Sequence, residues 1–154
     1  MDSRLTLNEW HRKQAVDNFN QTWDLIDRAA RSPEENLAMI HKAHASRYHW
    51  GEVGGLHEMA TGEWQISRVY ALLGMGESSL FHARAGLSYC ERGSLSPFDI
   101  AIAHEALARA SHVLGARGQR DEALAAARSF AATIEKDEDR RYALAEIDSI
   151  MKDS

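Results

Sequence analysis

Turn signals at short intervals constrain this chain more than any other feature of its sequence. They separate seven segments of helical length, within which apolar residues recur every three or four positions. Ser32 with Pro33, and Ser96 with Pro97, each mark a helix start, because serine caps a helix and proline suits its first turn. No segment alternates with period two over strand length. We therefore predict an all-α fold, with helices near residues 8–31, 33–50, 57–73, 77–92, 97–115, 121–135 and 138–151.

The first predicted helix combines a cap with an unusually aromatic surface. Asn8 is the expected N-cap, and one apolar face is predicted to consist of Val16, Phe19, Trp23, Ile26 and Ala30. Trp10, Phe19 and Trp23 together offer more aromatic surface than a solvated end helix needs. We therefore expect self-association through this helix, most simply as a homodimer.

Composition limits the class of protein. With 154 residues, 44% of them hydrophobic, the chain is expected to form one helical domain over 1–154. A formal charge of -5 offers no general attraction to a phosphate backbone, so nucleic acid is not an expected partner. The single Cys90 excludes an internal disulfide and is expected to pack as a small apolar group. The absence of a signal-peptide core and of a long apolar run predicts a cytoplasmic protein without a membrane segment.

An internal repeat organises the middle of the chain. The stretch SRVYALLG (67–74) aligns with ARASHVLG (108–115), a spacing of 41 residues because residue 67 matches residue 108. A turn and a helix rich in small residues follow each stretch. Small residues fall at matching points of the first helix (Ser67, Ala108) and of the second (Ser79, Ala123), and Tyr70 follows the first of them. This pattern resembles the tetratricopeptide repeat (TPR) over residues 60–135.

The resemblance implies a short right-handed TPR-like α-solenoid of antiparallel helix pairs, with the first two helices as a divergent leading pair. It also implies a scaffold that binds a protein or peptide on its concave face. The unit exceeds the usual period of about 34 residues, and Ser111 stands where the second copy should carry an aromatic residue. The stretches AHASRYHWGEVG and GEWQISRVYALL are also similar to bacterial proteins of this helical-repeat type, a likeness that implies no activity.

A cluster of histidine, aromatic and basic residues is the main candidate for a site. His44 and Tyr48 share a helical stripe, and Arg68 follows Trp64 by four residues, which favours a guanidinium lying over the indole. Arginine can hold a carboxylate or phosphate, and aromatic rings can form apolar walls. The predicted ligand-binding residues are His44, Arg47, Tyr48, His49, Trp50, Glu63, Trp64 and Arg68.

Three interpretations of this cluster stay open at the level of sequence. In the first, the rings fill a helix interface and their polar ends bond to the backbone or to Glu63. In the second, the cluster binds a peptide, a partner protein or a small anionic ligand. In the third, His41, His44 and His49 hold a metal, and Glu63 activates water in a metal-dependent hydrolase. No nucleophile elbow or phosphate loop is present, so we favour the interaction module and expect no cofactor.

Overall fold

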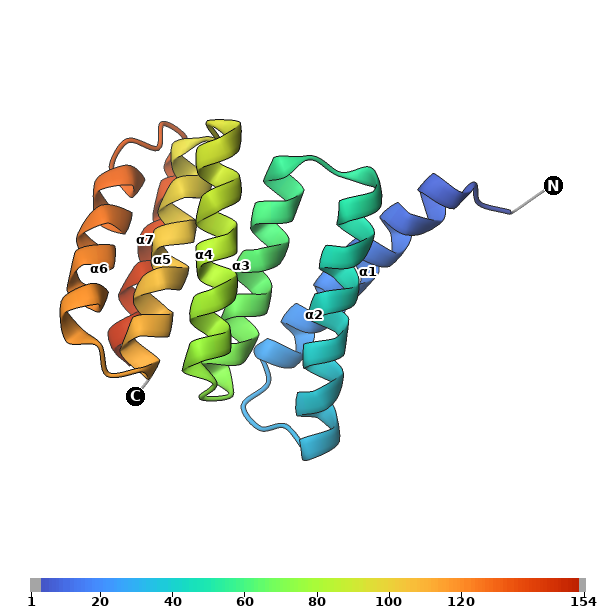
Figure 1. Cartoon of the computed structure of the whole chain (residues 1–154), viewed down its shortest axis with the longest axis horizontal. Helices are drawn as coiled ribbons and strands as arrows, with labels where there is room; N and C mark the ends of the chain where they lie inside the picture. Colours follow the sequence, from blue (N-terminus) through green and yellow to red (C-terminus); the bar gives the residue numbers. More distant parts are fainter. Residues whose placement is uncertain (1–3, 153–154) are drawn as a thin grey trace.

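The computed structural model describes residues 4–152, and over that range the protein is all-helical, as predicted. It contains seven α-helices and no strand in the described part of the chain. Figure 1 shows α3 to α7 side by side at one end, while α1 and α2 cross at the other. The helices are α1 (Leu7–Ile26), α2 (Pro33–Val53), α3 (Leu56–Leu72), α4 (Gly76–Gly93), α5 (Pro97–Val113), α6 (Arg117–Ala131) and α7 (Asp137–Ser149), followed by a 3-10 turn (Ile150–Lys152).

The Ser-Pro starts of α2 and α5 are confirmed. Ser32 accepts a hydrogen bond from the Glu35 amide, and the Glu35 side chain accepts one from the Ser32 amide, which closes a capping box. Ser96 accepts the corresponding bond from the Asp99 amide. The predicted Asn8 cap is wrong, because Thr6 caps α1 in a capping box of its own and Asn8 lies inside the first turn.

Helix α1 ends at Ile26, before the predicted end at residue 31. Arg31 folds back and donates from its guanidinium to the carbonyls of Leu25 and Arg28, which satisfies the exposed helix end. Ala30 therefore lies outside the helix. The predicted apolar stripe is also divided, because α1 packs against both α2 and α3: Val16 is 40% exposed, whereas Ala15, Thr22, Leu25 and Ile26 are buried.

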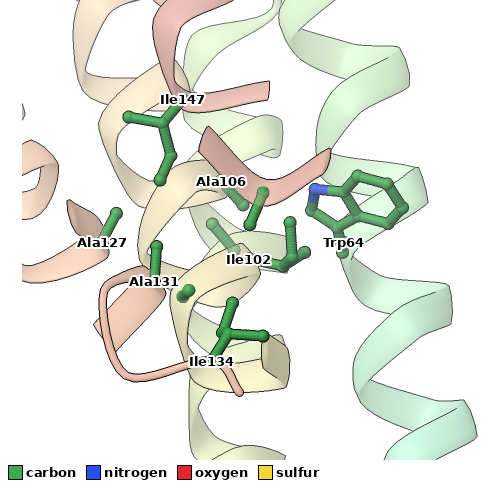
Figure 2. Close-up of a cluster of buried hydrophobic side chains, with 10 residues drawn as sticks. Trp64, Ile102, Ala106, Ala127, Ala131, Ile134 and Ile147 are labelled. Carbon is green, nitrogen blue, oxygen red and sulfur yellow. The ribbon is translucent and has the colours of Figure 1, made fainter. Parts of the chain in front are cut away.

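Helices that follow one another in the chain pack together, and α3 and α5 also pack against each other. Figure 2 shows the largest apolar cluster, in which Trp64 of α3 meets Ile102 and Ala106 of α5. Ala127 and Ile147 bring α6 and α7 to the same cluster. Small residues on α5 and α6 allow this close approach. By contrast, α2 and α4 make no backbone contact within the described residues, and neither do α4 and α6.

The predicted repeat has a direct counterpart in two matching turns. Gly74 and Gly115 both adopt a left-handed backbone, with φ of 75° and 72°. After the first glycine, the Met75 amide donates to the Tyr70 carbonyl at 2.8 Å. After the second, the Ala116 amide donates to the Ser111 carbonyl at 2.9 Å. These are the bonds of a Schellman motif, in which glycine avoids the strain of a positive φ.

Ser67 and Ser79 mark a close approach of α3 and α4. Each hydroxyl donates to the other residue's carbonyl, at 2.8 Å in both directions. The sequence comparison paired Ser79 with Ala123, and that pairing is displaced. Helix α6 starts at Arg117, one turn before the predicted start at residue 121, because RGQR lacks the apolar seam from which a start can be recognised. The spacing of 41 thus continues through the turn, and Arg120 (79 + 41) corresponds to Ser79.

Candidate functional site

The predicted site residues do not form one face, because the structure distributes them over three places. His44, Arg47 and Glu63 lie between α2 and α4. The aromatic end of α2, residues 48–50, faces the start of α1. Trp64 and Arg68 point to the other side of α3, toward α5 and α7. A helix turns by about 100° per residue, so adjacent residues of α3 contact different neighbouring helices.

Polar and aromatic side chains fill the gap between α2 and α4. His44 Nε2 is 2.8 Å from the Tyr70 hydroxyl, and the Tyr70 ring stacks on His82 at 5.7 Å between centroids. His82 Nδ1 in turn lies 2.8 Å from a Glu63 oxygen. Burial, assisted by the nearby His82, lowers the pKa of His44, although Glu63 acts in the opposite direction. This arrangement agrees with the interpretation in which the rings fill an interface.

Arg47 completes this network. Its Nε lies 3.3 Å from Glu63 Oε1, and its Nη2 donates to the Tyr89 hydroxyl at 2.9 Å. Gly62 makes room for it, since a Cβ at Gly62 would come within 2.9 Å of Arg47 Cδ. The Arg47 guanidinium is therefore held between Glu63 and Tyr89 in this gap.

The end of α2 forms a separate cluster with α1. His49 Nδ1 lies 2.8 Å from His11 Nδ1, and burial, with the nearby His11, lowers the pKa of His49. Tyr48 is 63% exposed, whereas His44, one turn earlier on α2, is partly buried. Within α1, Trp10 remains 43% exposed, whereas Phe19 and Trp23 pack against the core. Most of the aromatic surface assigned to self-association is therefore used inside the chain.

A buried ionic cluster connects α3, α5 and α7. Glu105 is fully buried and accepts hydrogen bonds from Trp64 Nε1 and Arg109 Nε, both at 2.8 Å. Arg68 bonds to Glu146 Oε2 at 2.6 Å. Its guanidinium lies over the Trp23 ring, 5.8 Å from the centroid, rather than over Trp64 as predicted. The indole of Trp64 is instead directed into the core by its bond to Glu105.

A cavity of about 540 Å³ opens beside this cluster, between α3, α5 and the 3-10 turn. Its polar lining consists of Arg68, Arg109 and His112, and no carboxylate is among the lining residues. Arg120 donates to His112 Nδ1 at 3.3 Å, which leaves the other ring nitrogen to carry a proton. All three polar side chains can thus donate hydrogen bonds. We call this feature the arginine cavity.

Sequence reasoning missed Glu105, Arg109, His112 and Glu146. A signal for the first two was present: they are four apart on a helix whose other inward positions are almost all alanine or isoleucine. Charged residues at buried positions are costly unless paired, so their place on that stripe indicates an internal pair. Nothing in the sequence indicates that Glu146, far along the chain, reaches Arg68.

The proposed metal ligands are not brought together. Among residues 4–152, no group of three histidine, cysteine, aspartate or glutamate side chains is placed to hold a metal ion. His44 and His49 instead belong to the two different clusters described above, with Tyr70 and His11 as their respective partners. In the same range, no helix is long and apolar enough to cross a bilayer.

No protein-family model, no curated protein and no solved structure matches this chain. Any functional conclusion therefore depends on the geometry of the molecule itself.

Proposed function

We propose that this protein is a TPR-like interaction module that binds an acidic segment of a partner protein in the arginine cavity. The repeated Gly74 and Gly115 turns and the contact of Ser67 with Ser79 support the TPR-like arrangement of helix pairs. Such modules bind partners on their concave face. Here α3 and α5 are the first helices of two successive pairs.

One observation carries the proposal: the arginine cavity has donors and no carboxylate in its lining. Arg68 and Arg109 are held in place by Glu105 and Glu146, so their orientation costs nothing further when a ligand binds. Guanidinium groups bind carboxylates and phosphates with favourable fork geometry. A Glu, Asp or phosphorylated side chain shares the required chemistry, whereas a neutral segment does not.

The test is titration calorimetry with three synthetic peptides of one sequence, containing glutamate, phosphoserine or glutamine at two central positions. We expect the charged peptides to bind at least about tenfold more tightly than the glutamine peptide, a difference near 1.4 kcal/mol. Arg68→Gln should remove that difference. Arg128→Gln is the matched control, because Arg128 forms an exposed pair with Asp148 and does not line the cavity. Equal binding of all three peptides, or an equal loss in both variants, would refute the proposal.

A further inference from the structure

The gap between α2 and α4, the first gap, is filled by side chains, whereas the gap between α4 and α6, the second gap, is open. Helices α4 and α6 stand apart over α5, as α2 and α4 stand apart over α3. Between α4, α5 and α6 lies a cavity of about 430 Å³. It continues along α4 into a second hollow, because Leu80, Arg84 and Leu114 line both. We call this feature the α4–α6 groove.

Comparison of the two repeats explains why the groove is open. Tyr70 and His82, which stack in the first gap, correspond at the spacing of 41 to Ser111 (70 + 41) and Ala123 (82 + 41). Both small residues line the cavity. The second repeat therefore has the same helix framework without the two rings that close the gap in the first.

Ser111 places a hydroxyl group in this cavity. The residue is only 4% exposed, yet its hydroxyl makes no hydrogen bond within the described residues. Because this hydroxyl lines the cavity, it can bond to a polar group that enters there. The walls beside it are apolar, with Leu80 from α4 and Leu107 from α5. A group that satisfied this position would have an apolar ring and a polar tip, as Tyr70 has in the first gap.

Charged side chains at the rim of the groove indicate which residues should flank the aromatic residue of a binding partner. Arg84 is exposed on α4 and forms no ion pair in the part of the chain that the structure describes. Glu122 of α6 lines the same cavity, and Glu77 lines the hollow farther along α4. Phe81, which is 68% exposed, extends the apolar surface along the groove. This surface is complementary to a helix that carries an aromatic residue between one acidic and one basic side chain.

We propose that the α4–α6 groove binds a partner helix through a tyrosine side chain, which takes the place that Tyr70 fills in the first repeat. The phenol ring lies against Leu107 and Ala123, and its hydroxyl meets Ser111. An acidic residue of the partner pairs with Arg84. This site is separate from the arginine cavity and does not depend on the function proposed above.

The experiment uses the full chain and NMR chemical-shift titration. The probes are 4-methylphenol, toluene and a short amphipathic helical peptide with one tyrosine flanked by glutamate and lysine. We expect shifts confined to the groove, with 4-methylphenol binding more tightly than toluene. The peptide should bind at least about tenfold more tightly than 4-methylphenol and lose that advantage when its tyrosine becomes alanine. If 4-methylphenol binds as tightly as the peptide, or if nothing binds, the proposal is wrong.

Ser111→Tyr supplies the missing ring from within the chain. We expect it to raise the melting temperature and abolish binding of both phenol and peptide. Ser129→Tyr, on an exposed position of α6, is the matched control and should leave binding unchanged. Should Ser111→Tyr fail to fold, Ala126→Leu narrows the same cavity and must still weaken binding at least about tenfold. Unchanged binding in a folded groove-filling variant would overturn the proposal.

Discussion

Replacement of Glu105 by glutamine tests the buried ionic cluster most directly. The carboxylate uses separate oxygens for its two donors, Oε1 for Arg109 and Oε2 for Trp64. A glutamine amide has one acceptor oxygen, so one of these donors must face an NH₂ group. The substitution also leaves the Arg109 guanidinium, at 6% side-chain exposure, without its buried carboxylate. Because glutamine has nearly the same shape as glutamate, the loss of stability reports the change in charge and hydrogen bonding and not a change in packing.

The expected magnitude follows from these two effects. Removal of one partner from a buried ion pair costs about 3–5 kcal/mol. We expect the lower half of that range, because Arg109 keeps its bonds to the Glu146 carbonyl and the Ser149 hydroxyl. For a domain with a stability of about 5–15 kcal/mol this is a large fraction. It should appear as a clear fall in the urea midpoint.

Urea unfolding, followed by far-UV circular dichroism, measures this loss. Glu122→Gln, on the exposed face of α6, is the control and should change stability by less than about 0.5 kcal/mol. Combining Glu105→Gln with Arg109→Met should cost less than the sum of the two single changes, because the second removes the uncompensated charge. If Glu105→Gln costs less than about 1 kcal/mol with an unchanged urea m-value, the buried ion pair does not stabilise the fold to the extent expected.

Three further predictions concern other parts of the chain. Burial lowers the pKa of His44 below its usual 6.5, so the unfolded chain takes up the proton first and stability falls as the pH drops below that value. In urea unfolding, His44→Gln should reduce this dependence of stability on pH. His49 and His104, whose pKa values are also lowered, should maintain part of it. Gly115→Ala should lower the free energy of unfolding by about 1–2 kcal/mol, because residue 115 has a positive φ. Gly118→Ala, at a helical position with open space around it, should raise the free energy of unfolding by about 0.5–1 kcal/mol in the same measurement. Cys90 is 1% exposed and its pKa is raised to about 12, so a thiol reagent at neutral pH should modify it only in denaturant; rapid reaction in the native protein would contradict its burial.

The parts of the fold that the sequence predicted are those set by local interactions. Ser32 and Ser96 start helices because their caps lie within three residues of them. The Gly74 and Gly115 turns were visible for the same reason. The end of α1 was not predictable, because Arg31 satisfies that helix end from beyond it, and a side chain folding back leaves no periodic signal.

The candidate site was less predictable because helical spacing does not choose among tertiary partners. Trp64 and Arg68 are close enough along α3 to stack, yet each finds a stronger partner elsewhere. Glu105 offers the indole a charged acceptor, and Glu146 offers the guanidinium an ion pair. Charge-assisted bonds of this kind are about twice as strong as neutral ones, so they override a weak contact along one helix.

The predicted site residues are dispersed because α3 lies at the centre of the helix stack. Within two turns, Glu63 reaches α2 and α4, Ser67 bonds to α4, and Arg68 reaches α1 and α7. A helix surrounded on all sides cannot present a broad face to a ligand, whatever its composition. Binding surfaces must then lie where the surrounding helices leave it or its neighbours uncovered. The arginine cavity at the end of α3 and the α4–α6 groove over α5 are two places that meet this condition. Two arginines line the first, whereas leucine and alanine side chains form much of the wall of the second. The same stacking that buries much of the predicted cluster therefore leaves two cavities with different linings.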